Sequence, residues 1–163
     1  MTERFYQGNK FIVEIESYAH QLAKDLFRAN FVDLRPLSGN IAGIATTFAL
    51  CRPGDTVLEV GNGHQYANKL ASSGLKVDLK SVSIPWDDAR SNIDLPATIE
   101  LIQEHRPRVV NIGSGIFLFP QPTSALKQAM IKVNPDSYLV YDAAHVLGLI
   151  AGGQFQSPLE EGT

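Results

Sequence analysis

Apolar residues recur at helical spacing between Phe11 and Arg28. The repeating apolar positions there are Ile12, Ile15, Ala19, Leu22 and Leu26. Steps of three and four place these side chains on one side of a helix, so the stretch predicts an amphipathic helix. A second apolar run, from Ile41 to Cys51, is rich in alanine and leucine and predicts a buried helix.

Elsewhere, short apolar stretches bounded by glycine and proline alternate with helical patterns. The predicted strands are Phe31 to Arg35, Thr56 to Val60, Val77 to Ile84, Val109 to Ile112 and Tyr138 to Tyr141. The predicted helices among them are Gln65 to Ser72, Pro96 to His105 and Ser124 to Val133. A parallel crossover connection needs a helix to bring the chain back. The alternation therefore predicts an α/β fold of three αβα layers, with a mostly parallel sheet flanked by helices.

Composition and charge narrow the class of protein. The chain has 163 residues, of which 44% are hydrophobic and 19% charged, as in a soluble single-domain protein. A net charge of −3 without a basic stripe argues against a nucleic-acid partner. Cys51 is the single cysteine, the first residues lack a secretory signal pattern, and no apolar run reaches the roughly 20 residues of a membrane helix. We therefore expect a cytoplasmic protein with no membrane segment.

Ligands of parallel α/β sheets bind in the loops that follow the strands. The corresponding loops here are Ser38 to Asn40, Gly61 to His64, Gly113 to Phe119 and Asp142 to His145. Asp142 directly follows an apolar strand, so it is either a functional carboxylate or the N-cap of the next turn. His145 falls on the same side of a helical turn that starts there, where a structural role is the alternative to a functional one.

The other loops also have two interpretations each. Ser38-Gly39-Asn40 precedes an apolar helix whose free N–H groups suit a phosphate, but serine and asparagine are also common caps. The loop from Gly61 to His64 either places an imidazole at the sheet edge or is a plain turn. Ser114 and the aromatic residues Phe117 and Phe119 either line a pocket or belong to the core. No nucleotide-binding glycine motif follows a strand, and the remaining histidines lack zinc-ligand spacing.

In order and spacing, these segments resemble the serine hydroxymethyltransferases, which are pyridoxal-phosphate enzymes of fold type I, the aminotransferase-like class. The resemblance covers nearly the whole chain. The matching stretches are Arg4 to Gly8, Glu14 to Glu16, Leu37 to Ala42, Pro53 to Leu58 and Tyr141 to Gly153. The last of these is the most specific, because it contains an Asp-x-Ala-His motif that ends at His145.

The resemblance implies roles for residues in this motif and in the first loop. Asp142 would pair with the pyridine nitrogen of pyridoxal phosphate and keep it protonated, and His145 would lie beside the phenolic oxygen. A protonated pyridine withdraws electrons from the bond that breaks at the α-carbon of the amino acid. Ser38 and Gly39, with Asn40 in place of a second serine, would hold the phosphate.

Three further positions follow from the same resemblance. His64 would stack on the cofactor ring. A serine that contacts the ring oxygen falls at Gly115 or, with a shift of one residue, at Ser114. Tyr6 matches a tyrosine that reaches the active site of the neighbouring subunit, which implies a homodimer or another homo-oligomer.

In relatives, the lysine that forms the Schiff base with the cofactor follows the Asp-x-Ala-His strand, whereas the last lysine here is Lys132. We therefore expect a fragment: residues 1–163 form one partial domain, with a helical segment over 1–30 and part of a truncated pyridoxal-phosphate-binding large domain over 31–163. Such a fragment is expected to be inactive alone and to bind the cofactor weakly or not at all. The parent would interconvert serine and glycine by one-carbon transfer with a folate or pterin carrier. The alternatives are another fold type I enzyme, such as an aldolase, lyase or decarboxylase, and a non-catalytic dimerisation module.

Overall fold

The computed structural model describes residues 8–73, 77–115 and 117–163. The chain divides into two compact units, Met1–Pro36 and Leu37–Thr163. Helix α1 (Lys10–Phe27) makes up most of the first unit. It ends at Arg28, whose left-handed backbone (φ 52°) directs its N–H to the carbonyl of Lys24. The helix predicted over this stretch is therefore confirmed to within one residue at each end.

The stretch from Phe31 to Arg35 is not a strand, so this prediction is wrong. The carboxylate of Asp33 accepts hydrogen bonds from the main-chain N–H of Arg35 at 3.0 Å and from its Nε at 2.8 Å. These bonds join residues two positions apart, so they satisfy the backbone locally and compete with an extended ladder. Among the described strands, none pairs with this stretch, and Phe31 is 93% exposed.

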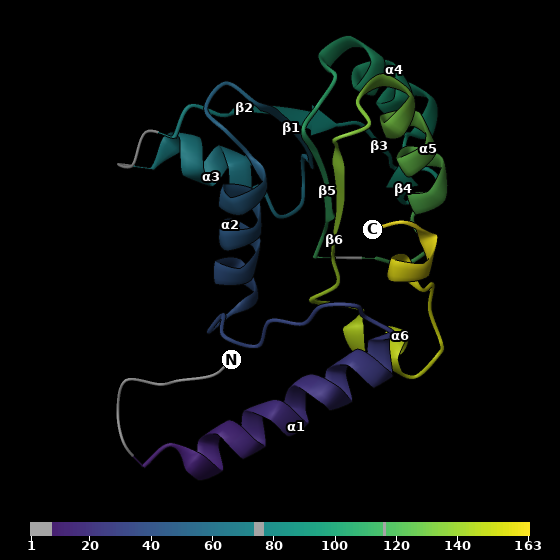
Figure 1. Ribbon diagram of the computed structural model, residues 1–163. Coiled ribbons are helices and arrows are strands. Elements are labelled where there is room, and N and C mark those ends of the chain that lie inside the picture. The colour runs from purple at the N-terminus through teal and green to yellow at the C-terminus, as the bar shows by residue number, and fades with distance from the viewer. Residues whose placement is uncertain (1–7, 74–76, 116) are drawn as a thin grey trace. The chain divides into compact units, whose positions relative to one another are not determined.

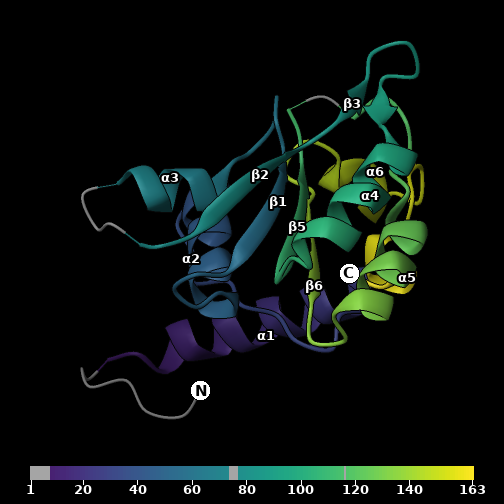
Figure 2. The ribbon, with the colours of Figure 1, turned by 90° about the horizontal axis from the view of Figure 1, so that it is seen from above.

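Four parallel strands form the main sheet of the second unit, in the order β2-β1-β5-β6. The strands are β1 (Thr56–Val60), β2 (Lys80–Ile84), β5 (Val109–Gly113) and β6 (Tyr138–Asp142). The larger helices of this unit are α2 (Gly39–Leu50), α3 (Tyr66–Ser72), α4 (Leu95–His105) and α5 (Thr123–Val133). Helices α2 and α3 cover one face of the sheet, and α4 and α5 cover the other (Figure 1 and Figure 2). The predicted α/β class, with a parallel sheet between helices, is confirmed.

Successive residues of the central strands pack into two apolar clusters, one on each face. On the first face, Val57 and Val109 lie in a cluster with Leu70 of α3. On the second face, Leu58 lies in a cluster with Ile102 of α4 and with residues of α5. Both central strands are buried, which matches their continuous apolar sequences.

Helix α2 is less buried than its apolar sequence predicts. Its inner side packs on the first cluster through Ile44 and Leu50, but Phe48 is 63% exposed. The expectation of a buried helix is wrong for the outer side, because the described residues of this unit cover only the inner one. Like the other helices of the described ranges, α2 does not combine the length and apolar character needed to cross a membrane.

Three short features lie outside what the sequence pattern predicts. They are the antiparallel ribbon of β3 (Trp86–Asp87) and β4 (Asn92–Ile93), the helix α6 (Leu147–Ala151), and the 3-10 helix η1 (Pro158–Glu161). Each is too short to show a repeating apolar pattern. Gln156 ties this last part of the chain to the sheet, because it accepts a hydrogen bond from the Tyr141 hydroxyl at 3.2 Å and donates to the carbonyl of Gln121 at 3.1 Å.

Candidate functional site

The loops that follow β1 and β6 meet at the carboxyl edge of the sheet. His64 lies in the first loop, and its Nδ1 is 2.6 Å from Oδ2 of Asp142, the last residue of β6. Because an ionised carboxylate only accepts hydrogen bonds, Nδ1 carries the hydrogen. The ring of His145 lies 5.5 Å from that of His64, centre to centre. Three residues singled out from the sequence therefore form one cluster.

Asp142 is half-buried and accepts three hydrogen bonds from described residues. Besides His64, the Tyr66 hydroxyl donates to Oδ2 at 2.5 Å, and the N–H of Ala144 donates to Oδ1 at 3.0 Å. Burial raises the pKa of the Asp142 carboxyl, but these hydrogen bonds outweigh burial and hold that pKa below its ordinary value. The N-cap of α6 is Val146, so Asp142 does not cap that helix, but its bond from the Ala144 N–H does cap the turn that follows β6. Asp142 is therefore an ionised carboxylate at the mouth of the sheet.

The loop that carries His64 is fastened to β5. Asn111, which is buried on that strand, donates from Nδ2 to the carbonyl of His64 at 2.9 Å, and the N–H of His64 donates to the carbonyl of Gly113 at 2.9 Å. Gly63 forms an antiparallel bridge with Ser114, and a Cβ at Gly63 would lie 1.7 Å from the Gly113 oxygen. Glycine at this position allows the close approach that places the imidazole, so the loop is more than a plain turn.

Helix α3 begins at Tyr66 and is anchored by the buried Glu59 of β1. The Glu59 carboxylate accepts hydrogen bonds from the N–H groups of Ala67 at 2.8 Å and Asn68 at 3.2 Å, which are free donors of the first turn. It also accepts the hydroxyl of Ser81 at 3.0 Å. A carboxylate at a helix N-terminus is stabilised by these donors and by the helix dipole. Glu59 thereby fixes the start of α3 and the position of Tyr66.

The loop before α2 adds a second group of polar atoms near this edge. Ser38 is the N-cap of α2, and its Oγ accepts a main-chain N–H of the first turn at 3.2 Å. The Nζ of Lys69 donates to Oδ1 of Asn40 at 2.9 Å, which brings an ammonium to the start of α2. A Cβ at Gly39 would lie 3.9 Å from Cβ of Ala144, so the start of α2 borders the turn after β6.

The remaining predicted residues lie beside the His64 loop, in the core, at the surface or outside the described residues. Ser114 is buried and lines a mostly apolar hollow of about 440 Å³ together with Trp86. Phe117 belongs to the core, where its ring lies 5.4 Å from that of Tyr141, whereas Phe119 is half-exposed. Tyr6 lies outside the described residues.

Four residues of the site escape the sequence analysis: Tyr66, Lys69, Glu59 and Asn111. A signal exists for two of them, because Glu59 and Asn111 interrupt strands that are otherwise apolar. They are register partners on adjacent strands, so their side chains lie on the same face of the sheet. Buried polar side chains in central strands need hydrogen-bond partners, and here the partners are the loop and the helix that carry the site.

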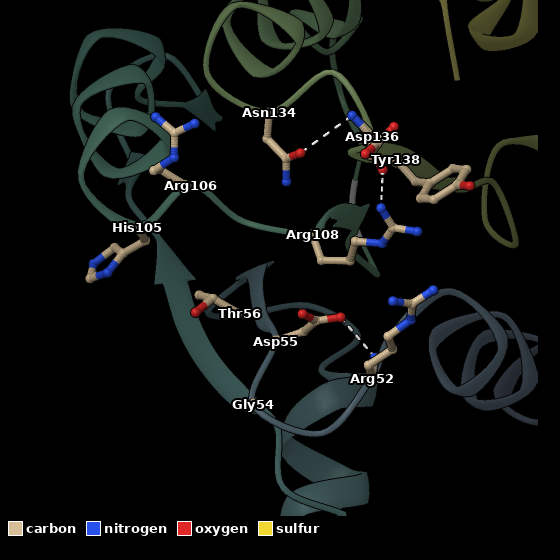
Figure 3. Close-up of a pocket in the computed structure, with 10 residues that line it drawn as sticks. All are labelled: Arg52, Gly54, Asp55, Thr56, His105, Arg106, Arg108, Asn134, Asp136 and Tyr138. Carbon is tan, nitrogen blue, oxygen red and sulfur yellow. Dashed lines mark hydrogen bonds between the residues drawn. The ribbon is translucent and has the colours of Figure 1, made fainter.

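A different hollow, of about 440 Å³, lies at the amino edge of the sheet (Figure 3). Among the arginines that line it, Arg106 and Arg108 have hydrogen-bond partners for their side chains. Arg106 donates to the carbonyl of Val133, the last residue of α5. Arg108 donates to the carbonyl of Leu50, the last residue of α2, at 3.1 Å and to that of Asp136 at 2.5 Å. Cations favour helix C-termini, so these arginines are explained as caps of the helix ends.

Comparison with known proteins agrees with the resemblance seen in the sequence. A family model described as serine hydroxymethyltransferase matches residues 1–163. The serine hydroxymethyltransferases of Methanocella arvoryzae and Picrophilus torridus are 45% and 44% identical to this chain over 162 residues. These alignments cover 98% of this chain but only 38% and 37% of the two relatives. The chain thus spans less than two-fifths of the length of these relatives.

A solved structure shows the same fold. The crystal structure of an L-threonine transaldolase from Pseudomonas fluorescens matches with a TM-score of 0.87 at 26% sequence identity. The match covers 100% of this chain and 36% of the transaldolase chain. The arrangement of strands and helices is therefore shared with a much longer enzyme chain.

Proposed function

Because the chain belongs to the serine hydroxymethyltransferase family, we propose that it supplies the pyridoxal-phosphate-binding part of such an enzyme. The observation that carries this proposal is the half-buried carboxylate of Asp142 at the end of β6. Its two oxygens offer about four acceptor positions, of which described residues occupy three. A protonated pyridine nitrogen is the kind of donor that suits the remaining position.

The start of α2 suits the other end of the same cofactor. Free main-chain N–H groups and the positive end of a helix dipole favour a phosphate. Ser38, Gly39 and Asn40 provide such a helix start, and the Lys69 ammonium beside Asn40 adds a positive charge. This group borders the turn after Asp142. A ligand with a ring nitrogen at one end and a phosphate at the other therefore matches the two groups of polar atoms.

Bound pyridoxal phosphate supplies an electron sink for the bond that breaks at the α-carbon of an amino acid. The residues of this chain contribute binding and proton placement. Asp142 keeps the ring nitrogen protonated because its carboxyl stays ionised. In this proposal His64 faces the ring, and His145 and Ser114 face its phenolic oxygen. The hydrogen bonds that join the His64 main chain to Asn111 and Gly113 hold the imidazole in position for this role.

We expect this chain to bind the cofactor without a covalent bond, and hence weakly. No lysine follows Asp142 in the sequence, since the last one is Lys132. Binding then depends on contacts to the ring and the phosphate alone. Reduction with borohydride in the presence of pyridoxal phosphate tests this point. A stoichiometric adduct on one lysine would contradict it.

For the longer protein we propose a one-carbon transfer between serine and a folate or pterin carrier, in a cytoplasmic homo-oligomer. The exposed apolar side of α2 supports association with another chain. It includes Ile41 and Phe48, and Leu37 lies just before the helix. Tyr6 would reach the neighbouring subunit. Sedimentation of the chain at several concentrations tests the association, and a purely monomeric species at all of them would contradict it.

The test of the cofactor site uses pyridoxine 5′-phosphate, which lacks the aldehyde and so cannot react with surface lysines. We expect saturable binding that weakens about tenfold or more in Asp142→Asn, because a charged hydrogen bond is lost. The control is Asp136→Asn, at the opposite edge of the sheet, which should bind like the wild type. Absence of saturable binding, or equal weakening in the control, would overturn the proposal.

A second candidate is a transaldolase or aldolase activity in the longer protein, because the L-threonine transaldolase shares the fold. Both candidates would place the same residues against the cofactor, so binding does not separate them. Turnover of serine that requires a reduced folate favours the first candidate. Folate-independent release of acetaldehyde from L-threonine favours the second.

A further inference from the structure

Tyr66 makes the shortest of the three described hydrogen bonds to Asp142, and no sequence motif contains it. Its hydroxyl donates to Oδ2 of Asp142 at 2.5 Å, while its side chain is almost fully buried at 3% exposure. A tyrosine with a buried body and a hydrogen-bonded tip is rigidly held. The carboxylate that we assign to the cofactor nitrogen is therefore held by a fixed hydroxyl.

The backbone of α2 makes room for this ring at Gly43. A Cβ at Gly43 would lie 2.1 Å from Cζ and 2.2 Å from Cε2 of Tyr66. No side chain fits there unless the ring moves, so Gly43 and Tyr66 form a matched pair. On another side, the ammonium of Lys69 lies 5.0 Å from the centre of the Tyr66 ring. Tyr66 therefore contacts both Asp142, through its hydroxyl, and the lysine that binds Asn40 at the start of α2.

The two side-chain donors to Oδ2 differ in kind. An imidazole carries a hydrogen on Nδ1 in only one of its two neutral tautomers, whereas a phenol hydroxyl can always donate to a carboxylate. We propose, building on the proposed function, that Tyr66 is a positioning residue of the cofactor site, whose hydroxyl holds Asp142 charged and in place for the ring nitrogen. Gly43 is part of the same arrangement, because its lack of a side chain leaves space for the Tyr66 ring.

The charged and titratable groups around Asp142 agree with this role. They are His64, His145, Tyr66, Lys69 and Glu59. Burial raises the pKa of Asp142, and the hydrogen bond from the Tyr66 hydroxyl lowers it more than the hydrogen bond from the Ala144 N–H or the one from His64. Burial also raises the pKa of Tyr66, and the bond to Asp142 raises it further. The hydroxyl therefore stays protonated and remains a donor at neutral pH.

The test is Tyr66→Phe, which keeps the ring and removes only the hydroxyl. Two quantities are measured on the whole chain: the pKa of the Asp142 carboxyl by carbon-13 NMR without ligand, and the dissociation constant of pyridoxine 5′-phosphate. We expect the pKa to rise and the binding to weaken about tenfold. The control is Tyr141→Phe, because that hydroxyl bonds Gln156 from the neighbouring position on β6. It should change neither quantity.

Gly43→Ala provides a second route, because it displaces the ring while keeping the hydroxyl. It should reproduce the effects of Tyr66→Phe in the folded protein. In an Asp142→Asn background, Tyr66→Phe should weaken binding no further, because the two residues act together. One outcome would overturn the role of Tyr66 but leave the proposed function standing. In it the wild type binds pyridoxine 5′-phosphate, Tyr66→Phe binds it equally well or more tightly, and the pKa of Asp142 is the same in both proteins. If the wild type does not bind at all, the proposed function falls as well.

Discussion

The side-chain amide of Asn111 donates to the main-chain carbonyl of His64 at 2.9 Å. A polar residue in the middle of a buried strand thus holds the loop that presents the imidazole to Asp142. The bond reaches across 47 positions of sequence, from β5 to the loop after β1. The position of His64 therefore depends on the sheet as well as on its own loop.

Removing this amide should loosen the loop. We expect Asn111→Ala to lower the free energy of unfolding by about 1–3 kcal/mol, because the partly buried His64 carbonyl loses its partner. Hydrogen exchange at the His64 amide should accelerate at the same time. The matched control is Asn68→Ala, which removes an exposed side-chain bond to Gln65 and should cost less than about 0.5 kcal/mol. Equal stability losses in both variants would contradict this account of the loop.

Gly63 should not tolerate a side chain. A Cβ there would lie 1.7 Å from the Gly113 oxygen, so Gly63→Ala must push the loop away from β5. We expect a loss of about 1–3 kcal/mol in denaturant unfolding. The control is Gly115→Ala, where an added Cβ meets no atom within 4 Å. If Gly63→Ala is as stable as the wild type and the NMR signal of the His64 amide is unchanged, the loop is not held against β5.

The Asp142 hydrogen bonds should make stability depend on pH. The pKa of Asp142 lies below its ordinary value of 3.8 in the folded protein. Its contribution is therefore present above about pH 4 and is lost as the pH falls from 3.8 through the folded value. Urea unfolding at a series of pH values should show a steeper acid loss for the wild type than for Asp142→Asn. Parallel curves for the two proteins would contradict this assignment.

Replacing an arginine at the amino edge of the sheet should lower the free energy of unfolding but leave the affinity for the ligand unchanged. Arg108→Lys loses bonds to two carbonyls and the stacking of its guanidinium 4.8 Å from the centre of the Tyr138 ring. We expect a loss of about 1–2 kcal/mol in unfolding free energy, with the affinity for pyridoxine 5′-phosphate unchanged. Arg90→Lys, at an 81% exposed side chain, is the control and should be neutral. A large loss of affinity in Arg108→Lys would mean that this edge takes part in ligand binding.

The sequence predicts what local pattern encodes, and this includes most of the fold. The helix before Arg28 and the apolar strand that ends in Asp142 follow from spacing and composition. The wrongly predicted strand from Phe31 to Arg35 shows the limit of that pattern, because a short apolar stretch alone does not supply a neighbouring strand. The same limit explains why the outer side of α2 is exposed although it is apolar. An apolar composition does not indicate which side of a helix is covered by other residues.

The site is predictable only in part, for a related reason. Asp142 and His145 stand out because they follow an apolar strand in a recognisable motif. Tyr66 reaches Asp142 across 76 positions, and its ring depends on a glycine in a different helix. No local sequence pattern predicts such a contact, which forms only when α2 and α3 pack on the sheet that contains β6.

We propose above all that the ionised carboxylate of Asp142 binds the ring nitrogen of the cofactor and keeps it protonated. The most direct measurement is the nitrogen-15 NMR signal of pyridoxine 5′-phosphate labelled at the ring nitrogen. It is recorded on the bound ligand at a pH at which the free ligand has lost its ring proton. We predict a protonated nitrogen in the wild type and an unprotonated one in Asp142→Asn. An unprotonated nitrogen in the wild-type complex would contradict the account.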